Sequence, residues 1–268
     1  MLAIPFPAID PVIVDFGPLI GLPLAIRWYS VMWLGGCVLA WLYVRRFVAR
    51  PPHAMSDRDA SDFLFWAILA TVIGGRLGYV GFYAPGLMLD SPLSLFAVWQ
   101  GGMSFHGGLI GMIVAMILFA RKRNLDMWAM SDAIACAAPI GLFLVRVANF
   151  INGELYGRVT DVPWGMVFPG AGEMPRHPSQ LYEALLEGLV LFLILFAVSR
   201  SERIRMKTGM LAGIFVIGYA AARGLVELVR QPDAHLGFLL GGATMGQLLT
   251  MPMLLLGIYL VIRARRAR

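Results

Sequence analysis

The stretch LLEGLVLFLILFAV, residues 185–198, decides the fold of this 268-residue chain. Apart from one glutamate it is apolar on every side, whereas a membrane barrel strand alternates polar and apolar residues over about 10 positions. A helix that crosses a bilayer needs about 20 mostly apolar residues, and this run supplies most of them. The stretch therefore predicts a transmembrane helix and excludes a β-barrel.

The composition extends this prediction to the whole chain. Hydrophobic residues make up 59% of the sequence, charged residues 14%, and the mean hydropathy is +0.74, whereas soluble domains carry about 25% charged residues. The net charge of +6 does not indicate a nucleic-acid partner, because the Lys and Arg residues lie in short clusters between apolar runs. Clusters of that kind set the orientation of a membrane protein.

The apolar runs predict an all-α, polytopic membrane protein with seven transmembrane helices in a single domain, residues 1–268. The first basic residue is Arg27 and no signal-peptide cleavage site is apparent, so the first helix is expected to stay in the mature protein. Bounded by charges, Pro and Gly, the seven spans lie near 22–44, 62–83, 96–120, 127–149, 180–199, 209–229 and 244–262.

The distribution of basic residues predicts the orientation. The loops near 45–61, 121–126 and 200–208, together with the tail from Arg263, hold 15 of the 22 Lys and Arg residues. Cytoplasmic loops carry the excess of positive charge. We therefore expect the N-terminus to face the outside, or periplasm, and the C-terminus to face the cytoplasm.

Soluble-enzyme motifs are missing from the sequence. Cys37 and Cys136 lie alone in separate apolar runs, which indicates packing rather than a metal pair or a disulfide. His53 and His235 fall in loops and appear in no ligand pattern. No HExxH, P-loop or serine elbow is present, so no metal site and no cofactor is expected.

Ionisable residues inside the predicted spans are the candidates for function. Each costs at least about 2.5 to 3.5 kcal/mol at a helix centre, so each is a functional-site candidate by default. In the predicted topology they come from different helices yet lie at one level, near the outer leaflet. They are Arg27, Arg76, His106, Arg146, Glu183, Glu187, Arg223 and Glu227.

The spacing of these charges favours an anionic guest. Glu183 and Glu187 lie four residues apart, and Arg223, Glu227 and Arg230 follow a helical spacing, so each set lines one helix face. Guanidinium groups match phosphate oxygens, which suggests an anionic lipid headgroup. The alternative is that each arginine pairs with a glutamate to hold helices together, or reaches the interface.

Small residues surround two of the candidates. The segments HGGLIG, residues 106–111, and GGRLG, residues 74–78, place glycines at the spacing that lets helices pack closely. Close packing is the simpler interpretation of the glycines. Arg76 remains a candidate for binding.

The segment RVANFINGELYGR, residues 146–158, closely resembles the signature of bacterial prolipoprotein diacylglyceryl transferases. Three further segments resemble the same family in the same order: FHGGLIG at 105–111, RHPSQLYE at 176–183 and RGLVELVRQPD at 223–233. Arg27-Trp28-Tyr29 and Met245-Gly246-Gln247 also fit. The resemblance covers essentially the whole chain.

The resemblance implies a multi-pass enzyme of the bacterial plasma (inner) membrane with an outward-facing site. Its reaction moves the sn-1,2-diacylglyceryl group of phosphatidylglycerol, a membrane lipid, to the lipobox cysteine of a prolipoprotein signal peptide, forming a thioether and releasing glycerol 1-phosphate. The residues carried over by matched motif are Tyr29, His106, Asp132, Arg146, Asn149, Glu154, Gly157, Tyr219 and Arg223. The buried-charge argument adds Arg76 and Glu227 as candidates for substrate binding.

For such a reaction we expect Arg146 and Arg223 to bind the phosphate and stabilise its developing charge. His106 is the histidine inside a predicted span, and it either accepts the thiol proton as general base or only orients the lipid by hydrogen bonds. Asn149 and Glu154 would position the headgroup or hold the arginines.

Other classes of membrane protein remain as alternatives. In a channel or transporter the same arginines would line an anion path, but the inner halves of the spans offer little polarity beyond Ser131 and Asp132. A pocket closed towards the cytoplasm fits this pattern better. A lipid flippase or a structural scaffold is a third alternative.

Overall fold

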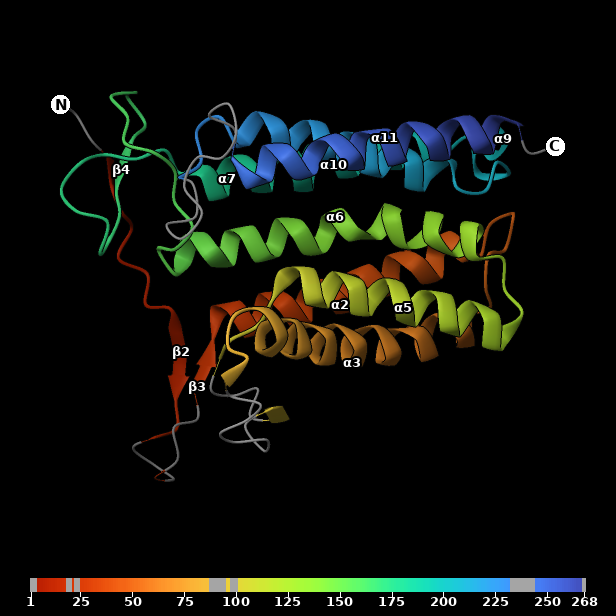
Figure 1. Cartoon of the computed structure of the whole chain (residues 1–268), viewed down its shortest axis with the longest axis horizontal. Helices are drawn as coiled ribbons and strands as arrows, with labels where there is room; N and C mark the ends of the chain where they lie inside the picture. The colour runs from red at the N-terminus through yellow and green to blue at the C-terminus, as the bar shows by residue number, and fades with distance from the viewer. Residues whose placement is uncertain are drawn as a thin grey trace. The chain divides into compact units, whose positions relative to one another are not determined.

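The computed structural model of the chain describes residues 4–17, 21, 25–86, 95–96, 101–231 and 244–266. Helices account for most of these residues (Figure 1). The chain divides into two compact units: the first comprises Met1–Tyr43 with Asp132–Arg268, and the second comprises Val44–Ser131.

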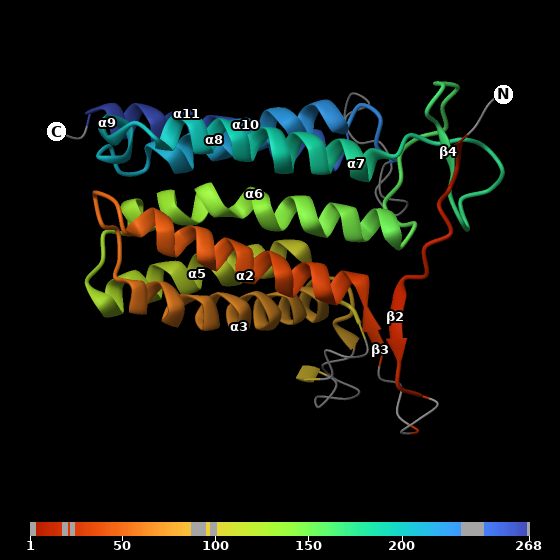
Figure 2. The same cartoon turned by 180° about the vertical axis from the view of Figure 1, so that it is seen from behind.

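The first unit contains most of the helices. One continuous apolar span, Ser179–Ser199, consists of α7, a π-helical segment η3 and α8. Helices α8 and α11 both pack against α10, as Figures 1 and 2 show from opposite sides. Two helices belong only in part to this unit: α2 Trp28–Val48 passes into the second unit at Val44, and α6 Met127–Ile151 enters the first unit at Asp132. The other helices of the unit are α7 Ser179–Glu183, η3 Ala184–Val190, α8 Leu191–Ser199, α9 Glu202–Arg205, α10 Met210–Val226 and α11 Met245–Arg266.

Glycines set the closest helix contacts of the first unit. A Cβ added at Gly213 of α10 would lie 3.0 Å from the carbonyl oxygen of Gly257 in α11. A Cβ at Gly36 of α2 would lie 3.2 Å from the Cα of Gly141 in α6. Small residues let backbones approach in a membrane, where dispersion and hydrogen bonds drive helix association.

The second unit is built on a pair of helices, α3 Asp57–Phe82 and α5 Phe105–Arg123. A Cβ added at Gly78 would lie 2.7 Å from the Cα of Gly107, and Gly74, Gly107 and Gly111 are equally close to backbone atoms of the facing helix. The prediction that these glycines serve helix packing is confirmed. Ser56 caps α3 in a capping box with Asp59, and Ser104 caps α5.

The prediction of a polytopic helical membrane protein is confirmed. Among the described residues, six helices are long and apolar enough to cross a membrane: Trp28–Val48, Asp57–Phe82, Phe105–Arg123, Met127–Ile151, Ser179–Ser199 and Met245–Arg266. Each coincides with one of the predicted spans. The remaining span, near 209–229, coincides with Met210–Val226, an apolar helix of 17 residues.

Two predicted spans begin later than expected. The first is predicted to begin near residue 22, but Ala25–Arg27 forms strand β3, which pairs antiparallel with β2, Val12–Asp15. The third is predicted to begin near residue 96, but α5 begins at Phe105. Gly101 and Gly102 adopt φ values of 81° and 74°, which a right-handed helix does not accommodate, so the helix cannot include them. His106 is therefore the second residue of its helix.

The short strands add to the all-α prediction without changing it. Besides β2 and β3, strand β1, Ile4–Pro5, pairs in parallel with β4, Met166–Val167. Next to that pair the buried ring of Phe168 lies 5.2 Å from Phe6 and 6.1 Å from Phe150, centroid to centroid. These contacts hold the segment that follows α6 against the N-terminal segment.

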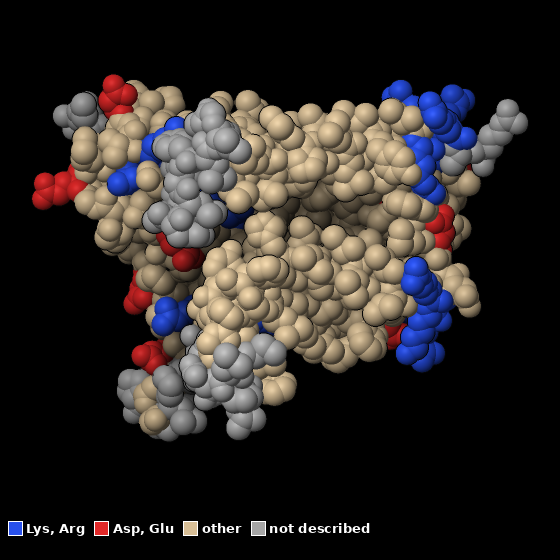
Figure 3. Space-filling model, viewed as in Figure 1, with Lys and Arg blue, Asp and Glu red and all other residues tan. Residues whose placement is uncertain are grey.

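Basic side chains gather at one end of the helices within each unit. In the first unit Arg263, Arg265 and Arg266 occupy the last turn of α11, and in the second Arg121, Lys122 and Arg123 occupy the last turn of α5. Figure 3 shows Lys and Arg clustered over these helix ends. Positive charge there complements the helix dipole, and it agrees with the loop charges from which the orientation is predicted.

Candidate active site

Glu183 is the centre of an ion-pair cluster in the first unit. Its side chain, at the end of α7, is fully buried. Glu183 Oε1 lies 2.6 Å from Arg223 Nη1 and 3.5 Å from Arg230 Nη1, and Oε2 lies 2.9 Å from Arg146 Nε. One carboxylate thus joins three arginines, from α6, from α10 and from the segment after α10.

Two further glutamates complete the cluster. Glu227 Oε2 lies 2.8 Å from Arg223 Nη2, one turn away in sequence. Glu187 approaches Arg146 Nη2 at 3.6 Å and Arg223 Nη1 at 3.9 Å. With three arginines and three glutamates, the cluster is formally neutral when all six are ionised.

Such a cluster is poorly explained by stability alone. Taking paired charges out of water often costs as much as the pairing returns. The three arginine side chains keep 13 to 14% of their surface exposed, whereas Glu183 and Glu187 have none. The carboxylates therefore fix the arginines from the buried side, while each arginine side chain keeps part of its surface accessible.

The loop after α6 positions a second group of polar side chains. Asn149 Nδ2 and Asn152 Nδ2 each donate to Glu154 Oε1 at 2.9 Å. Gly153 and Leu155 adopt φ values of 68° and 57°, which turn the chain sharply on either side of Glu154. Glu154 is exposed, and its backbone oxygen accepts a hydrogen bond from the buried amide of Gln180 at 2.5 Å.

Gly157 fits where no larger residue would. Its N–H donates to the backbone oxygen of His177 at 2.8 Å, and it forms a β-bridge with Arg230. A Cβ at this position would lie 2.6 Å from the backbone oxygen of Val229. Gly157 therefore ties the loop to the segment that carries Arg230.

Two tyrosines lie at the edge of the cluster. Tyr219, half-buried on α10, interacts electrostatically with Glu187, Arg146 and Arg223. Tyr29, at the start of α2 and 38% exposed, interacts with Glu154 and Arg146. Of the predicted site residues, the structure thus brings together Tyr29, Arg146, Asn149, Glu154, Gly157, Tyr219, Arg223 and Glu227 within the first unit.

The sequence comparisons agree with the motifs on which this site is built. The profile of the prolipoprotein diacylglyceryl transferase family matches residues 17–263. The chain belongs to this family. It is 55% identical over 265 residues to the phosphatidylglycerol–prolipoprotein diacylglyceryl transferase of Paramagnetospirillum magneticum, covering 98% of this chain and 97% of the relative. The protein of that name in Rhodospirillum rubrum is 52% identical over 270 residues, covering 100% and 97%.

His106 and Arg76 belong to the second unit. His106 is exposed next to Phe105 at the start of α5. Arg76 is buried, and its guanidinium donates to the backbone oxygens of Leu95 at 3.3 Å, Gly101 at 2.5 Å and Gly102 at 3.2 Å. Arg76 therefore holds the backbone of Gly101 and Gly102, which lead into the helix of His106.

Asp132, which the family resemblance included, has a structural position. It is buried near the start of α6 and accepts hydrogen bonds from the backbone N–H groups of Gly209 at 2.8 Å and Ala212 at 2.7 Å. It thereby satisfies orphan donors at the N-terminus of α10. At about 1.5 Å per residue it lies about 21 Å along α6 from Arg146.

The sequence argument left some contributors to the site without a role. Gln180 is buried and donates to the loop that carries Glu154, and its place in the RHPSQLYE motif is the signal that the sequence offers. A second group is His177, whose Nδ1 lies 3.2 Å from the Tyr182 hydroxyl, itself the acceptor of the Trp164 N–H at 2.6 Å. Burial lowers the pKa of His177, and the charge of Asp161 opposes this shift.

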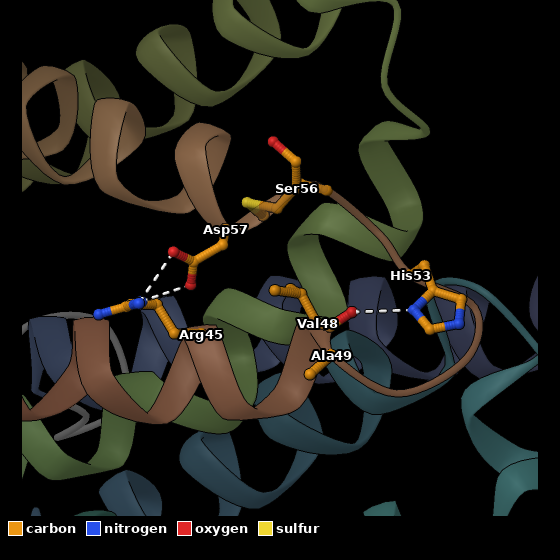
Figure 4. Close-up of a pocket in the computed structure, with 7 residues that line it drawn as sticks. Arg45, Val48, Ala49, His53, Ser56 and Asp57 are labelled. Atoms are coloured by element: carbon orange, nitrogen blue, oxygen red, sulfur yellow. Dashed lines mark hydrogen bonds and ion pairs between the residues drawn. The ribbon is translucent and has the colours of Figure 1, made fainter.

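A cavity of about 450 Å³ lies in the second unit, at the turn between α2 and α3, away from every predicted site residue of that unit. Figure 4 shows Arg45 paired with Asp57 across it, while His53 Nδ1 lies 3.2 Å from the backbone oxygen of Val48. Both contacts are local, because they join residues in or next to the loop that connects α2 to α3. His53 thus lies in a loop, as predicted, whereas His235 lies outside the described residues.

Gly246 allows α11 to approach the cluster, and we predict that Gly246→Ala destabilises the protein. The added Cβ would lie 2.5 Å from Glu227 Cδ and 2.7 Å from both carboxylate oxygens. Overpacking of this kind costs about 1 to 3 kcal/mol. Thermal unfolding of the purified protein in detergent measures it.

Gly224→Ala on α10 is the matched control, because the nearest atom to its Cβ would be Thr250 Oγ1 at 3.9 Å. That change should leave the unfolding temperature unchanged or raise it, since alanine favours a helix. Equal unfolding temperatures for the two variants would contradict the close approach of Gly246 to Glu227.

Proposed function

We propose that this chain transfers the sn-1,2-diacylglyceryl group of phosphatidylglycerol to the cysteine thiol of a prolipoprotein. A carbon–sulfur bond forms, the ester bond from the glyceryl carbon to phosphate oxygen breaks, and its electron pair leaves with glycerol 1-phosphate. The product is a thioether at the lipobox cysteine of the signal peptide. This is a step of lipoprotein biosynthesis, in keeping with the family to which the chain belongs.

One observation carries the proposal beyond family membership: the buried carboxylate of Glu183 forms ion pairs with both Arg146 and Arg223. A lipid phosphate presents two oxygens that a guanidinium can bind at once. Because the carboxylates fix the arginines before substrate arrives, little reorganisation is needed when negative charge develops on the leaving phosphate.

We assign further roles by position. Asn149 and Glu154 position the lipid headgroup next to Arg146. Tyr29 and Tyr219 contact the substrate at the edges of the same site. Gly157 provides the close approach that the loop needs, and Glu227 positions Arg223.

In the second unit, His106 serves either as general base for the thiol or as a hydrogen-bonding group for the lipid. Arg76 acts on His106 indirectly, through the backbone of Gly101 and Gly102 that it holds. It is therefore a positioning residue in this proposal.

We propose that residues 1–268 form one catalytic domain and that the protein lies in the bacterial inner membrane. Met210–Val226 is its seventh span, since 17 residues at about 1.5 Å each cover about 26 Å of a core about 30 Å thick. The N-terminus faces the periplasm and the C-terminus the cytoplasm. This orientation brings the cluster at the end of α10 to the outer leaflet.

Cysteine labelling tests this orientation. In a cysteine-free background in intact cells, an impermeant thiol reagent should modify cysteines placed at Arg158 and Arg230, and should leave those at Arg121 and Arg203 unmodified until the cells are opened. Labelling from outside at position 121 would contradict the topology and the outer-leaflet site together.

The cysteine-free variant used in that experiment is itself the subject of a prediction. Cys37→Ala with Cys136→Ala should keep full transfer activity, because the nucleophilic thiol belongs to the substrate. Cys136 is buried and Cys37 partly buried, and neither forms a disulfide. Loss of turnover in a folded double variant would indicate covalent catalysis by the enzyme.

The deciding experiment for function uses purified protein, phosphatidylglycerol labelled in its acyl chains, and a synthetic lipobox peptide. Label should appear on the peptide thiol, with release of glycerol phosphate, and a peptide with serine in place of cysteine should remain unlabelled. Flux of anions or scrambling of lipid in reconstituted vesicles, without peptide labelling, would instead identify a channel or a flippase.

A further inference from the structure

Glu187 is the least satisfied charge of the cluster. Both of its carboxylate oxygens are buried, and among the described residues neither accepts a hydrogen bond. Its arginine contacts, at 3.6 and 3.9 Å, are the longest that the cluster makes to any of its glutamates. Glu183 and Glu227 each have an arginine nitrogen within 2.9 Å.

The backbone around Glu187 accounts for its long distances to Arg146 and Arg223. Glu187 lies inside the π-helical segment η3, a rare geometry that often occurs at functional sites. The next residue, Gly188, faces α6 so closely that an added Cβ would lie 2.7 Å from the Cβ of Phe143. Glu187 is therefore kept at the cluster without room for its segment to shift towards α6.

Charge balance predicts what a bound phosphate does. The cluster is neutral with six ionised residues, so a phosphodiester bound to Arg146 and Arg223 adds one negative charge to a largely buried site. The guanidiniums will leave their weakest partner first. A buried carboxylate without a close cation takes up a proton rather than stay charged.

We propose that Glu187 is a charge-compensating residue that takes up one proton when the lipid phosphate binds to Arg146 and Arg223. This inference rests on the proposed function, because it takes phosphatidylglycerol as the ligand. No covalent bond of Glu187 other than O–H changes. The neutral form frees both guanidiniums for the phosphate, first in the ester and then in the leaving group.

Other charged groups face Glu187 and set the background for its titration. From α6, α7, α10 and the segment after α10 they are Arg146, Glu183, Tyr219, Arg223, Glu227 and Arg230. Arginines stay protonated throughout the range of the experiment. Glu183 and Glu227 each have an arginine nitrogen within 2.9 Å, which Glu187 lacks.

Calorimetry of the unmodified protein tests the proton uptake directly. Full-length protein in neutral detergent is titrated with a short-chain phosphatidylglycerol in buffers of different ionisation enthalpy, with phosphatidylcholine as the uncharged control lipid. At a pH at which Glu187 of the lipid-free protein is charged, the heat should vary with buffer by the amount expected for about one proton per lipid. Heats that do not depend on the buffer would overturn the proposal.

Variants assign the proton to Glu187. Over the range in which free Glu187 is charged, affinity of the natural protein for phosphatidylglycerol should fall about tenfold per pH unit. Glu187→Gln mimics the neutral form, so its affinity should stay within about twofold across that range. Glu202→Gln, at an exposed position on α9, should keep the slope of the natural protein.

The same preparations separate the two proposals. If the natural protein labels the lipobox peptide but Glu187→Gln keeps the full pH slope, Glu187 is not the proton site and the inference fails alone. If Glu187→Gln is folded by thermal unfolding and no longer binds phosphatidylglycerol, the carboxylate is needed in its charged form and the inference also fails. Failure of the natural protein to label the peptide would defeat the proposed function itself.

Discussion

Replacing Arg146 or Arg223 by lysine is expected to lower the rate of diacylglyceryl transfer by about tenfold to a hundredfold, although the positive charge survives. Arg146 directs Nε towards Glu183 and Nη2 towards Glu187, while Arg223 directs Nη1 towards Glu183 and Nη2 towards Glu227. A lysine ammonium is a single point that cannot bridge two carboxylates and also bind a phosphate. The lost charge-assisted hydrogen bond corresponds to about 1.5 to 3 kcal/mol.

Release of glycerol phosphate by purified variants in detergent measures this effect. Thermal unfolding accompanies each assay, because the same side chains hold α6, α7 and α10 together. Arg121→Lys at the exposed end of α5 is the matched control and should act at the normal rate. Near-normal rates for both Arg146→Lys and Arg223→Lys would mean that the arginines act only as charges, and the two-point phosphate clamp would then be wrong.

The sequence was sufficient for the parts of the fold that follow from hydrophobicity. Seven apolar runs predicted seven helices, and each run coincides with a helix in the structure. The glycine spacing at residues 74–78 and 106–111 predicted close packing, which the approach of Gly78 to Gly107 confirms. Hydrophobicity and glycine spacing are local signals that repeat along a helix, so they can be recognised in the sequence without knowledge of tertiary contacts.

Features set by long-range contacts could not be predicted in this way. Strand β3 depends on pairing with β2, and only three of its residues take part. The late start of α5 depends on the backbone of Gly101 and Gly102, to which Arg76 binds. The π-helical segment η3 has no hydrophobic signature, because one extra residue in a turn leaves an apolar run apolar.

The candidate site was predicted as a set of charges but not as a set of pairs. Burial cost identified Arg146, Arg223 and Glu227 one residue at a time. The spacing of four residues accounts for the pair of Arg223 with Glu227. Which arginines meet Glu183 and Glu187 depends instead on how α6, α7 and α10 are arranged, and no spacing within a single helix contains that information. The family resemblance includes Asp132, and its hydrogen bonds to Gly209 and Ala212 at the start of α10 are likewise contacts that no local spacing predicts.

Glu183→Gln should be the most destabilising substitution in the site, because it removes the carboxylate that three arginines share. Glu183 is fully buried, and the glutamine amide cannot balance Arg146, Arg223 and Arg230. Breaking a buried ion pair from one side costs about 3 to 5 kcal/mol, which corresponds to a fall of about 6 to 20 °C in the unfolding temperature at this chain length. A double-mutant cycle with Arg230→Gln supplies the control, since removing one surplus cation should restore part of the loss. An unfolding temperature unchanged by Glu183→Gln, or losses that simply add in the double variant, would show that Glu183 does not hold the cluster together.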